Sequence, residues 1–147
     1  MNNKNTRVIR VGDVLIGGNN PISVQSMTNT RTSDINSTIE QIRRLEEVGC
    51  DIVRSAVTSI DDAKAIKNIK EHINIPIIAD IQYDYKLALE SIKYGIDGLR
   101  INPGNIGSLD KVKDVVKACK DSNLSIRIGV NSGSIKKEFL EKYNGVN

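Results

Sequence analysis

A strand-then-helix pattern that repeats roughly every 25 residues is the strongest constraint on how this chain can fold. Each of five apolar, strand-like segments is followed by a segment whose apolar residues recur at helical spacing. The predicted strands span 22–27, 51–57, 75–81, 98–102 and 125–131. Strands that alternate with helices pair in parallel, so the pattern predicts an α/β protein whose sheet is covered by helices.

Capping residues mark the ends of the predicted helices. Asp34 can cap the first helix, and Gly49 can close it. Ser59 and Asp62 form a capping-box pattern before the second helix, and Ser108 can cap the fourth. These signals divide the chain into the same five units as the apolar pattern does.

The residues before the first unit have a different pattern. Two short alternating segments flank Gly12-Asp13, a pair typical of a two-residue hairpin turn. We therefore predict an N-terminal β-hairpin, placed to cover the bottom of the sheet if the sheet curls into a barrel.

Polar residues at the strand ends favour one of two possible architectures. An open doubly wound sheet collects its ligand in one crevice, whereas a (β/α)₈ barrel places polar residues at the carboxyl end of strand after strand. No G-x-G-x-x-G follows the first strand, which weakens a dinucleotide-binding interpretation. The chain carries such residues on every predicted strand: Gln25, Arg54, Asp80, Gln82, Arg100, Asn102, Arg127 and Asn131. We predict an incomplete (β/α)₈ barrel of the TIM type, with about five βα units and open edges at its first and last strands.

Three strand-end arginines suggest an anion-binding site. Strand side chains alternate, so Arg100 and Asn102 share one face, as do Arg127 and Asn131. Arg54, Arg100 and Arg127 would repel one another in a partly dry cleft, and a diphosphate suits the planar fork of arginine. The alternative is that each arginine pairs with a nearby carboxylate, such as Asp80.

Composition and motifs exclude several function classes. The net charge of +3 comes from scattered lysines and arginines, which does not favour nucleic acid as a partner. The N-terminus carries no export signal and the chain has no apolar run of membrane-spanning length, so we expect a cytoplasmic protein without a membrane partner. Cys50 and Cys119 lie in no metal-binding spacing and are expected to be buried, reduced thiols. His72, the one histidine, is expected to be solvated near the end of a helix.

Five collinear motifs carry a family resemblance that spans essentially the whole chain: "PISVQSMTNTRTSD", "GCDIVR", "ADIQYDYKLAL", "GLRINPGNIG" and "IRIGVNSGS". The chain resembles the 4-hydroxy-3-methylbut-2-en-1-yl diphosphate synthases, iron–sulfur oxidoreductases of non-mevalonate isoprenoid biosynthesis. The resemblance implies a TIM barrel that binds 2-C-methyl-D-erythritol 2,4-cyclodiphosphate and a C-terminal domain whose 4Fe-4S cluster is held by three cysteines and a glutamate. It also implies reductive ring opening with loss of water, ferredoxin or flavodoxin as electron donor, and a homodimer.

The resemblance also implies roles for residues of the site. Arg54, Arg100 and Arg127 match the arginines that grip the diphosphate, Asn102 and Asn131 match substrate-binding asparagines, and Asp80 matches the acid of the "ADI" strand. The family usually has "ADIHFDYR" where this chain has "ADIQYDYK", so Gln82 replaces a histidine. Glutamine forms hydrogen bonds but carries no proton at neutral pH, so an acid role at this position is in doubt.

The length of the chain limits what it is expected to do alone. Residues 1–147 correspond to the N-terminal part of the substrate-binding barrel, without the last barrel units and the iron–sulfur domain. We therefore expect substrate-binding residues but assign no catalytic residue, metal ligand or bound cofactor to this chain, and expect it to be inactive in isolation. Two alternatives are a pteridine-binding barrel of the dihydropteroate synthase kind and a truncated remnant without catalysis.

Overall fold

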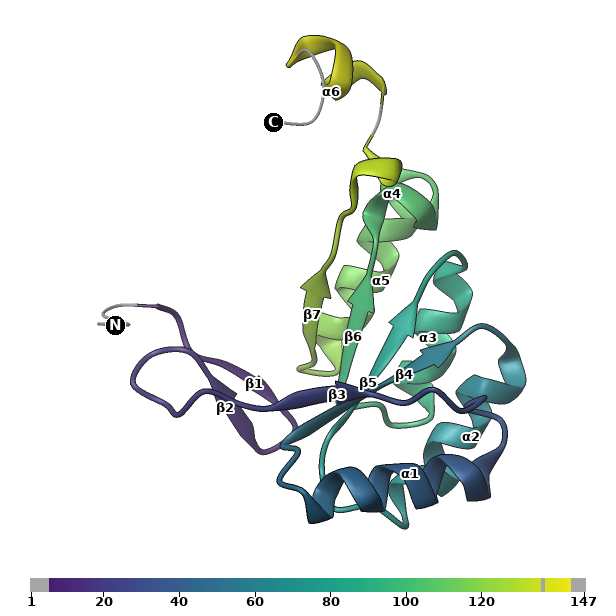
Figure 1. Cartoon of the computed structure of the whole chain (residues 1–147). Coiled ribbons are helices and arrows are strands. Elements are labelled where there is room, and N and C mark those ends of the chain that lie inside the picture. The colour runs from purple at the N-terminus through teal and green to yellow at the C-terminus, as the bar shows by residue number, and fades with distance from the viewer. Residues whose placement is uncertain (1–5, 136, 144–147) are drawn as a thin grey trace.

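A computed structural model describes residues 6–135 and 137–143 of the chain. Its centre is a parallel sheet with the strand order β3-β4-β5-β6-β7, and helices cover one face of that sheet (Figure 1). The strands span Gln25–Met27 (β3), Ile52–Val57 (β4), Ile77–Ile81 (β5), Gly98–Ile101 (β6) and Ser125–Ile128 (β7). The sequential order and the uniform parallel pairing confirm the predicted succession of βα units.

The helices begin and end near the expected residues. They span Ile35–Glu47 (α1), Ile60–Lys70 (α2), Tyr85–Lys93 (α3), Pro103–Ile106 (α4), Leu109–Asp121 (α5) and Lys137–Lys142 (α6), with a 3₁₀ turn at Ser132–Ser134 (η1). Asp34 caps α1 by accepting from the backbone N–H of Ser37, and Ser59 and Asp62 form the complete capping box of α2. Ser108 occupies the position before α5 but its side chain makes no capping hydrogen bond. The short helix α4 was not expected.

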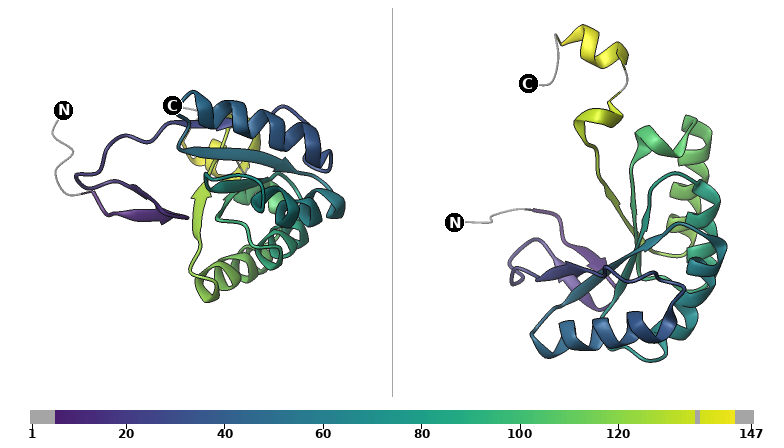
Figure 2. Two further views of the ribbon diagram at one scale, coloured as in Figure 1. Left: turned by 90° about the horizontal axis from the view of Figure 1, so that it is seen from below. Right: turned by 45° about the vertical axis from the view of Figure 1, so that its right-hand side comes forward.

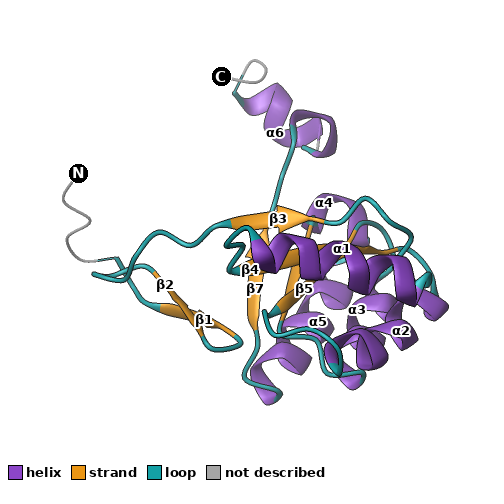
Figure 3. Cartoon of the chain, turned by 60° about the horizontal axis from the view of Figure 1, so that its bottom comes forward, coloured by secondary structure: helices purple, strands orange, loops and turns teal. Residues whose placement is uncertain are grey.

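Two apolar clusters lie on opposite faces of the sheet. The larger one packs the strands against the helices, and its strand members include Val53, Val57, Ile81, Leu99 and Ile101. Figure 3 shows α1, α2, α3 and α5 together on this side. Because strand side chains alternate, the intervening residues point to the other face of the sheet. On that face they contact the hairpin or form the candidate site.

The hairpin covers the amino-terminal end of the open face. Strands β1 (Ile9–Val11) and β2 (Val14–Ile16) pair antiparallel around the two-residue turn that the sequence predicted. Val11 is buried against Ile52 and Ile78. Gly12 has a φ of +57°, and a Cβ there would lie 2.8 Å from the Cβ of Pro76, just before β5. The predicted hairpin at the bottom of the sheet is therefore confirmed.

The sheet is curved and open in the described part of the chain. Strands β3 and β7 form its two edges, as predicted. In a flat sheet, four strand spacings would separate them by roughly 19 Å, too far for two side chains to bridge. Arg127 on β7 nevertheless donates from Nη1 to Oε1 of Gln25 on β3 over 3.0 Å. This hydrogen bond crosses the face opposite the helices, so the sheet bends as the wall of a barrel does (Figure 2).

The edge strands are shorter than predicted. The sequence suggested strands over 22–27 and 125–131, but β3 begins at Gln25 and β7 ends at Ile128. Val24 and Ile128 are 57% and 55% exposed. An edge strand has one neighbour rather than two, so its ends find hydrogen-bond partners and packing on one side alone. Within the described residues, no helix is long and apolar enough to cross a membrane.

Candidate functional site

Strand register places charged side chains in one row on the open face of the sheet. Asp80 on β5 is paired with Arg100 on β6, and Arg100 is paired with Arg127 on β7. Residues in register on parallel strands point to the same side, and the opposite side is occupied by the helix-facing cluster. Arg54 on β4 lies on this same open face, in register with Ile78 and one row nearer the hairpin.

Asp80 joins two of the three predicted arginines. Its Oδ1 lies 3.1 Å from Nη1 of Arg100, and its Oδ2 lies 3.5 Å from Nε of Arg54. The Asp80 side chain is 4% exposed, against 20% for Arg100 and 26% for Arg54. Pairing with Asp80 was the alternative to an anion site, yet one carboxylate balances only one of two guanidinium charges. A net positive charge remains in a partly dehydrated position.

Arg127 lies on the same face of the sheet as Arg54 and Arg100, but its hydrogen bond does not go to Asp80. It is exposed, and its hydrogen bond goes to Gln25 rather than to Asp80. It also lines a cavity of about 140 Å³ between the sheet and the hairpin, together with Val11, Ile16 and Ile78. The three arginines therefore share one side of the sheet, while only Arg54 and Arg100 share a partner.

The two predicted asparagines contact each other. Nδ2 of Asn102 donates to Oδ1 of Asn131 over 3.2 Å, and the same oxygen accepts from Oγ of Ser134 at 2.9 Å. Oδ1 of Asn102 accepts from the backbone N–H of Gly104 and so caps α4. Asn102 is 2% exposed, whereas Asn131 is exposed. In this arrangement Asn102 joins the loops after β6 and β7, and Asn131 remains the more accessible of the two.

Gln82 follows the last residue of β5 and is half-buried. It lies two residues beyond Asp80, so strand alternation assigns both to the same face. The described residues offer it no hydrogen bond in this structure.

One contact at the site was missed by the sequence analysis. The sulfur of Met27 lies 3.4 Å from Nε and 3.3 Å from Nη2 of Arg54. Met27 is in register with Arg54, and strand parity would have identified it as a neighbour. The Met27 sulfur therefore keeps the guanidinium of Arg54 beside β3 without adding a charge to the site.

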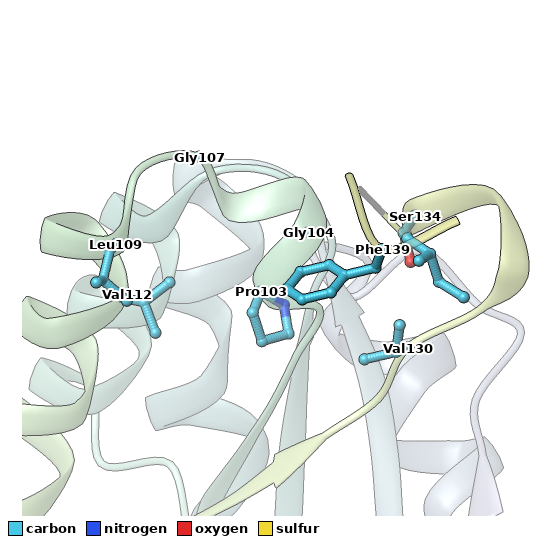
Figure 4. Close-up of a pocket in the computed structure, with 9 residues that line it drawn as sticks. Pro103, Gly104, Gly107, Leu109, Val112, Val130, Ser134 and Phe139 are labelled. Carbon is cyan, nitrogen blue, oxygen red and sulfur yellow. The ribbon is translucent and has the colours of Figure 1, made fainter. Parts of the chain in front are cut away.

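An apolar cavity of about 270 Å³ lies beyond the asparagine pair. Figure 4 shows Phe139 of α6 directed toward Pro103, with Leu109, Val112 and Val130 around them. Only Ser134 among its lining side chains carries a polar group. The cavity therefore offers apolar contact rather than acid–base chemistry.

The cysteines are poorly suited to hold an iron–sulfur cluster. Cys50 and Cys119 are both buried and free, and burial raises the pKa of the Cys119 thiol to about 11. A cluster needs thiolates, so this shift opposes ligation. The described residues contain no group of three or more His, Cys, Asp or Glu placed to hold a metal ion. The described residues therefore do not fit an iron–sulfur cluster.

Comparison with known proteins identifies the family. The sequence model of the GcpE TIM-barrel domain matches residues 6–147. The chain belongs to the GcpE family. This assignment and the curved parallel sheet confirm the predicted incomplete (β/α)₈ barrel with its N-terminal hairpin.

Curated relatives of this GcpE barrel carry one shared name, 4-hydroxy-3-methylbut-2-en-1-yl diphosphate synthase (flavodoxin). The relative from Clostridium perfringens is 59% identical over 143 residues, which is 97% of this chain and 41% of the relative. The relative from Fusobacterium nucleatum is 59% identical over 140 residues, or 95% of this chain and 40% of the relative. The chain thus spans about 40% of the length of these relatives.

Solved structures support the fold alone. A dihydropteroate synthase from Yersinia pestis has a TM-score of 0.65 at 8% identity and covers 93% of this chain and 54% of its own. A dihydropteroate synthase from Xanthomonas albilineans has a TM-score of 0.59 at 9% identity, with 92% and 54% covered. At such low identities the similarity shows that the GcpE barrel and the dihydropteroate synthases share an architecture, and it gives no information on function.

Proposed function

We propose that residues 1–147 are the N-terminal, substrate-binding part of a synthase that converts 2-C-methyl-D-erythritol 2,4-cyclodiphosphate into 4-hydroxy-3-methylbut-2-enyl diphosphate. The family assignment and the name shared by relatives at 59% identity support this proposal. The whole enzyme would be a cytoplasmic homodimer that takes electrons from flavodoxin, the donor in the relatives' name; ferredoxin is the alternative donor.

The observation that carries the proposal is the excess positive charge around Asp80. Arg54 and Arg100 share a single buried carboxylate, and Arg127 lies in the next register position. A guanidinium has five N–H donors, and Arg100 uses one of them on Asp80. The remaining donors suit the oxygens of a cyclic diphosphate, and each charge-assisted hydrogen bond contributes about 1.5 to 3 kcal/mol.

Within this reaction, the residues of the chain bind and orient the substrate. The overall conversion takes up two electrons and two protons, breaks the C–O bond that closes the diphosphate ring, and releases one water. A 4Fe-4S cluster held elsewhere in the full enzyme would supply the electrons. Arg54 and Arg100 would fix the diphosphate, with Arg127, Asn131 and Gln82 as further contacts and Asp80 positioning Arg54 and Arg100. Asn102 would support Asn131.

The alternative functions have less support. A pterin site needs apolar and amide contacts around a flat ring, whereas the polar face here is dominated by guanidinium groups. The likeness to dihydropteroate synthases lies in the fold. If the chain were a non-catalytic remnant, its arginine site would support no turnover even within a complete enzyme. The following experiment tests this alternative.

A chimera tests the proposed function. The 143 residues of this chain that align with the Clostridium perfringens relative, at 59% identity, would replace the matching segment of that relative. We expect the chimera to form product from the cyclodiphosphate under anaerobic, reducing conditions, and an Arg100→Gln chimera to lose most of that activity. The unmodified relative is the control. A folded, cluster-containing chimera without turnover, or an Arg100→Gln chimera as active as its parent, would refute the proposal.

A further inference from the structure

Gly129 lies against the guanidinium of Arg100. A Cβ built on Gly129 would be 2.7 Å from both Nε and Nη2 of Arg100 and 3.0 Å from Cζ. Carbon and nitrogen atoms that are not bonded to each other pack at about 3.5 Å or more. A side chain of any size at Gly129 therefore cannot coexist with the present position of Arg100.

Space, rather than backbone conformation, is what requires a glycine here. Gly129 is not among the glycines with a positive φ, so its backbone conformation is open to other residues. Its N–H donates to the carbonyl oxygen of Ile101 over 2.9 Å, which ties this part of the chain to β6. If a methyl group were added, moving the backbone would break that hydrogen bond. Swinging the flexible end of Arg100 away would break only its contact with Asp80.

We propose that Gly129 is a positioning residue for Arg100, and that its missing side chain provides the space in which the guanidinium lies. Asp80 holds Nη1 at 3.1 Å, and Gly129 accommodates the edge formed by Nε and Nη2. Together they fix the plane of the guanidinium, and hence the direction of the N–H groups that remain for an anion. The link to substrate affinity rests on the proposed function, whereas the packing relation itself does not.

The test compares Gly129→Ala with Gly133→Ala in the chimera proposed above. A Cβ at Gly133 would meet nothing within 4 Å and Gly133 has no positive φ, so this variant is a matched control. The first readout is the rate at which phenylglyoxal modifies Arg100, followed by peptide mass spectrometry. We expect Gly129→Ala to raise this rate several-fold and Gly133→Ala to leave it unchanged. An unchanged rate in Gly129→Ala would overturn the inference.

The second readout is affinity for inorganic pyrophosphate. We expect Gly129→Ala to raise the dissociation constant about tenfold, the effect of one lost charge-assisted hydrogen bond. In an Arg100→Lys background, which lacks Nη2, the same glycine substitution should have little further effect. An equal loss of affinity or of folding in both backgrounds would show that Gly129 acts through the backbone and not through Arg100.

The two readouts separate this inference from the proposed function. If the parent chimera and Arg100→Lys bind pyrophosphate equally, or neither binds it, the anion site is wrong. The modification rate of Arg100 still decides whether Gly129 positions it. Suppose instead that the parent binds pyrophosphate, Arg100→Lys does not, and Gly129→Ala binds as tightly as the parent. This result would support the anion site and refute the positioning role of Gly129.

Discussion

At the scale of single residues, Asp80 decides how close two arginines can lie. Its two oxygens contact Arg100 and Arg54 separately, and its side chain is almost fully buried. Two guanidinium groups at this spacing repel each other unless a negative charge lies between them. The carboxylate would also repel a diphosphate, so we propose that it positions the arginines and does not contact phosphate.

Replacing Asp80 tests this arrangement. We expect Asp80→Asn to lower the free energy of unfolding by about 1–2 kcal/mol, because it leaves two partly buried guanidinium groups without a counter-charge. Urea denaturation measures the change. Asp110→Asn is the control, since Asp110 pairs with Lys113 on an exposed helix surface and its loss should change stability by less than about 0.5 kcal/mol. Equal effects of the two substitutions would contradict the assigned role.

Asp62 shows how one buried carboxylate organises two loops. It accepts from the backbone N–H groups of Ser33, Thr58 and Ser59 and from Oγ1 of Thr58. Burial opposes its ionisation, but these hydrogen bonds outweigh burial, so the pKa of Asp62 lies below its usual value of 3.8. The ionised carboxylate therefore ties the loop after β3 to the start of α2.

We expect Asp62→Ala to destabilise the chain by about 2 kcal/mol at neutral pH. A pKa that is lower in the folded state contributes stability above the unfolded value and loses it as the pH falls through the folded value. The difference between parent and Asp62→Ala should therefore be full above about pH 5 and shrink below about pH 3.8. Chemical denaturation across this range measures it, with exposed Asp61→Ala as control. A difference that grows toward acid pH would refute the assignment.

At the scale of elements, the hairpin seals one end of the open face. Val11 is 4% exposed between Ile52 and Ile78, whereas Leu15 on the other face of the hairpin is 37% exposed. This contact leaves the carboxyl ends of the strands as the open side. The hairpin would therefore direct the proposed ligand to the arginines from the carboxyl ends of the strands.

The hairpin's contribution can be measured with paired truncations. We expect Val11→Ala to lower the free energy of unfolding by about 1–2 kcal/mol, because it removes buried methyl groups and leaves a small cavity. Leu15→Ala should cost less than about 0.5 kcal/mol, since exposed positions contribute little. Thermal or urea unfolding distinguishes the two. If Leu15→Ala proved as costly as Val11→Ala, the hairpin would be packed on its other face.

At the scale of the whole molecule, the two unpaired sheet edges are expected to determine how stable the isolated chain is and whether it associates. Strands β3 and β7 have no outer neighbour in the described chain, and Val24, Ile128 and Val130 are more than half exposed beside them. Unpaired strands with apolar side chains are templates for association. The isolated chain is therefore expected to be marginally stable and to form oligomers.

We expect size-exclusion chromatography of the isolated chain to show concentration-dependent association, and Ile128→Lys on the β7 edge to reduce it. Leu109→Lys, which is also exposed but lies on α5, is the matched control and should have a smaller effect. A monodisperse parent with a sharp cooperative transition would show that five βα units suffice.

Turnover is a further property of the whole molecule. Reductive ring opening needs an electron carrier, and the described residues contain no group of three or more His, Cys, Asp or Glu placed to hold a cluster. We expect the isolated chain to yield no 4-hydroxy-3-methylbut-2-enyl diphosphate after attempted cluster reconstitution, while the chimera serves as positive control. Product formation by the isolated chain would contradict this expectation.

Local patterns in the sequence were sufficient to predict the elements and their order. Apolar periodicity depends on the geometry of a single helix or strand, and caps such as Asp34 and Ser59 act within one turn. Alternation likewise placed Arg100 with Asn102, and Arg127 with Asn131, on one face of their strands, since parity is a property of each strand alone. The family resemblance pointed to the same residues, and their roles in binding remain predictions.

Only the tertiary structure decided which of these side chains meet. Gln25 and Arg127 are 102 residues apart, and their contact depends on the curvature of five strands. The shared carboxylate of Asp80, the Asn102–Asn131 pair and the space at Gly129 depend on the register between neighbouring strands. Register and curvature arise from the packing of the helices and the hairpin against the sheet, and a shift of one residue would turn every side chain to the opposite face. Such contacts therefore arise from the assembled sheet and from no single segment of the sequence.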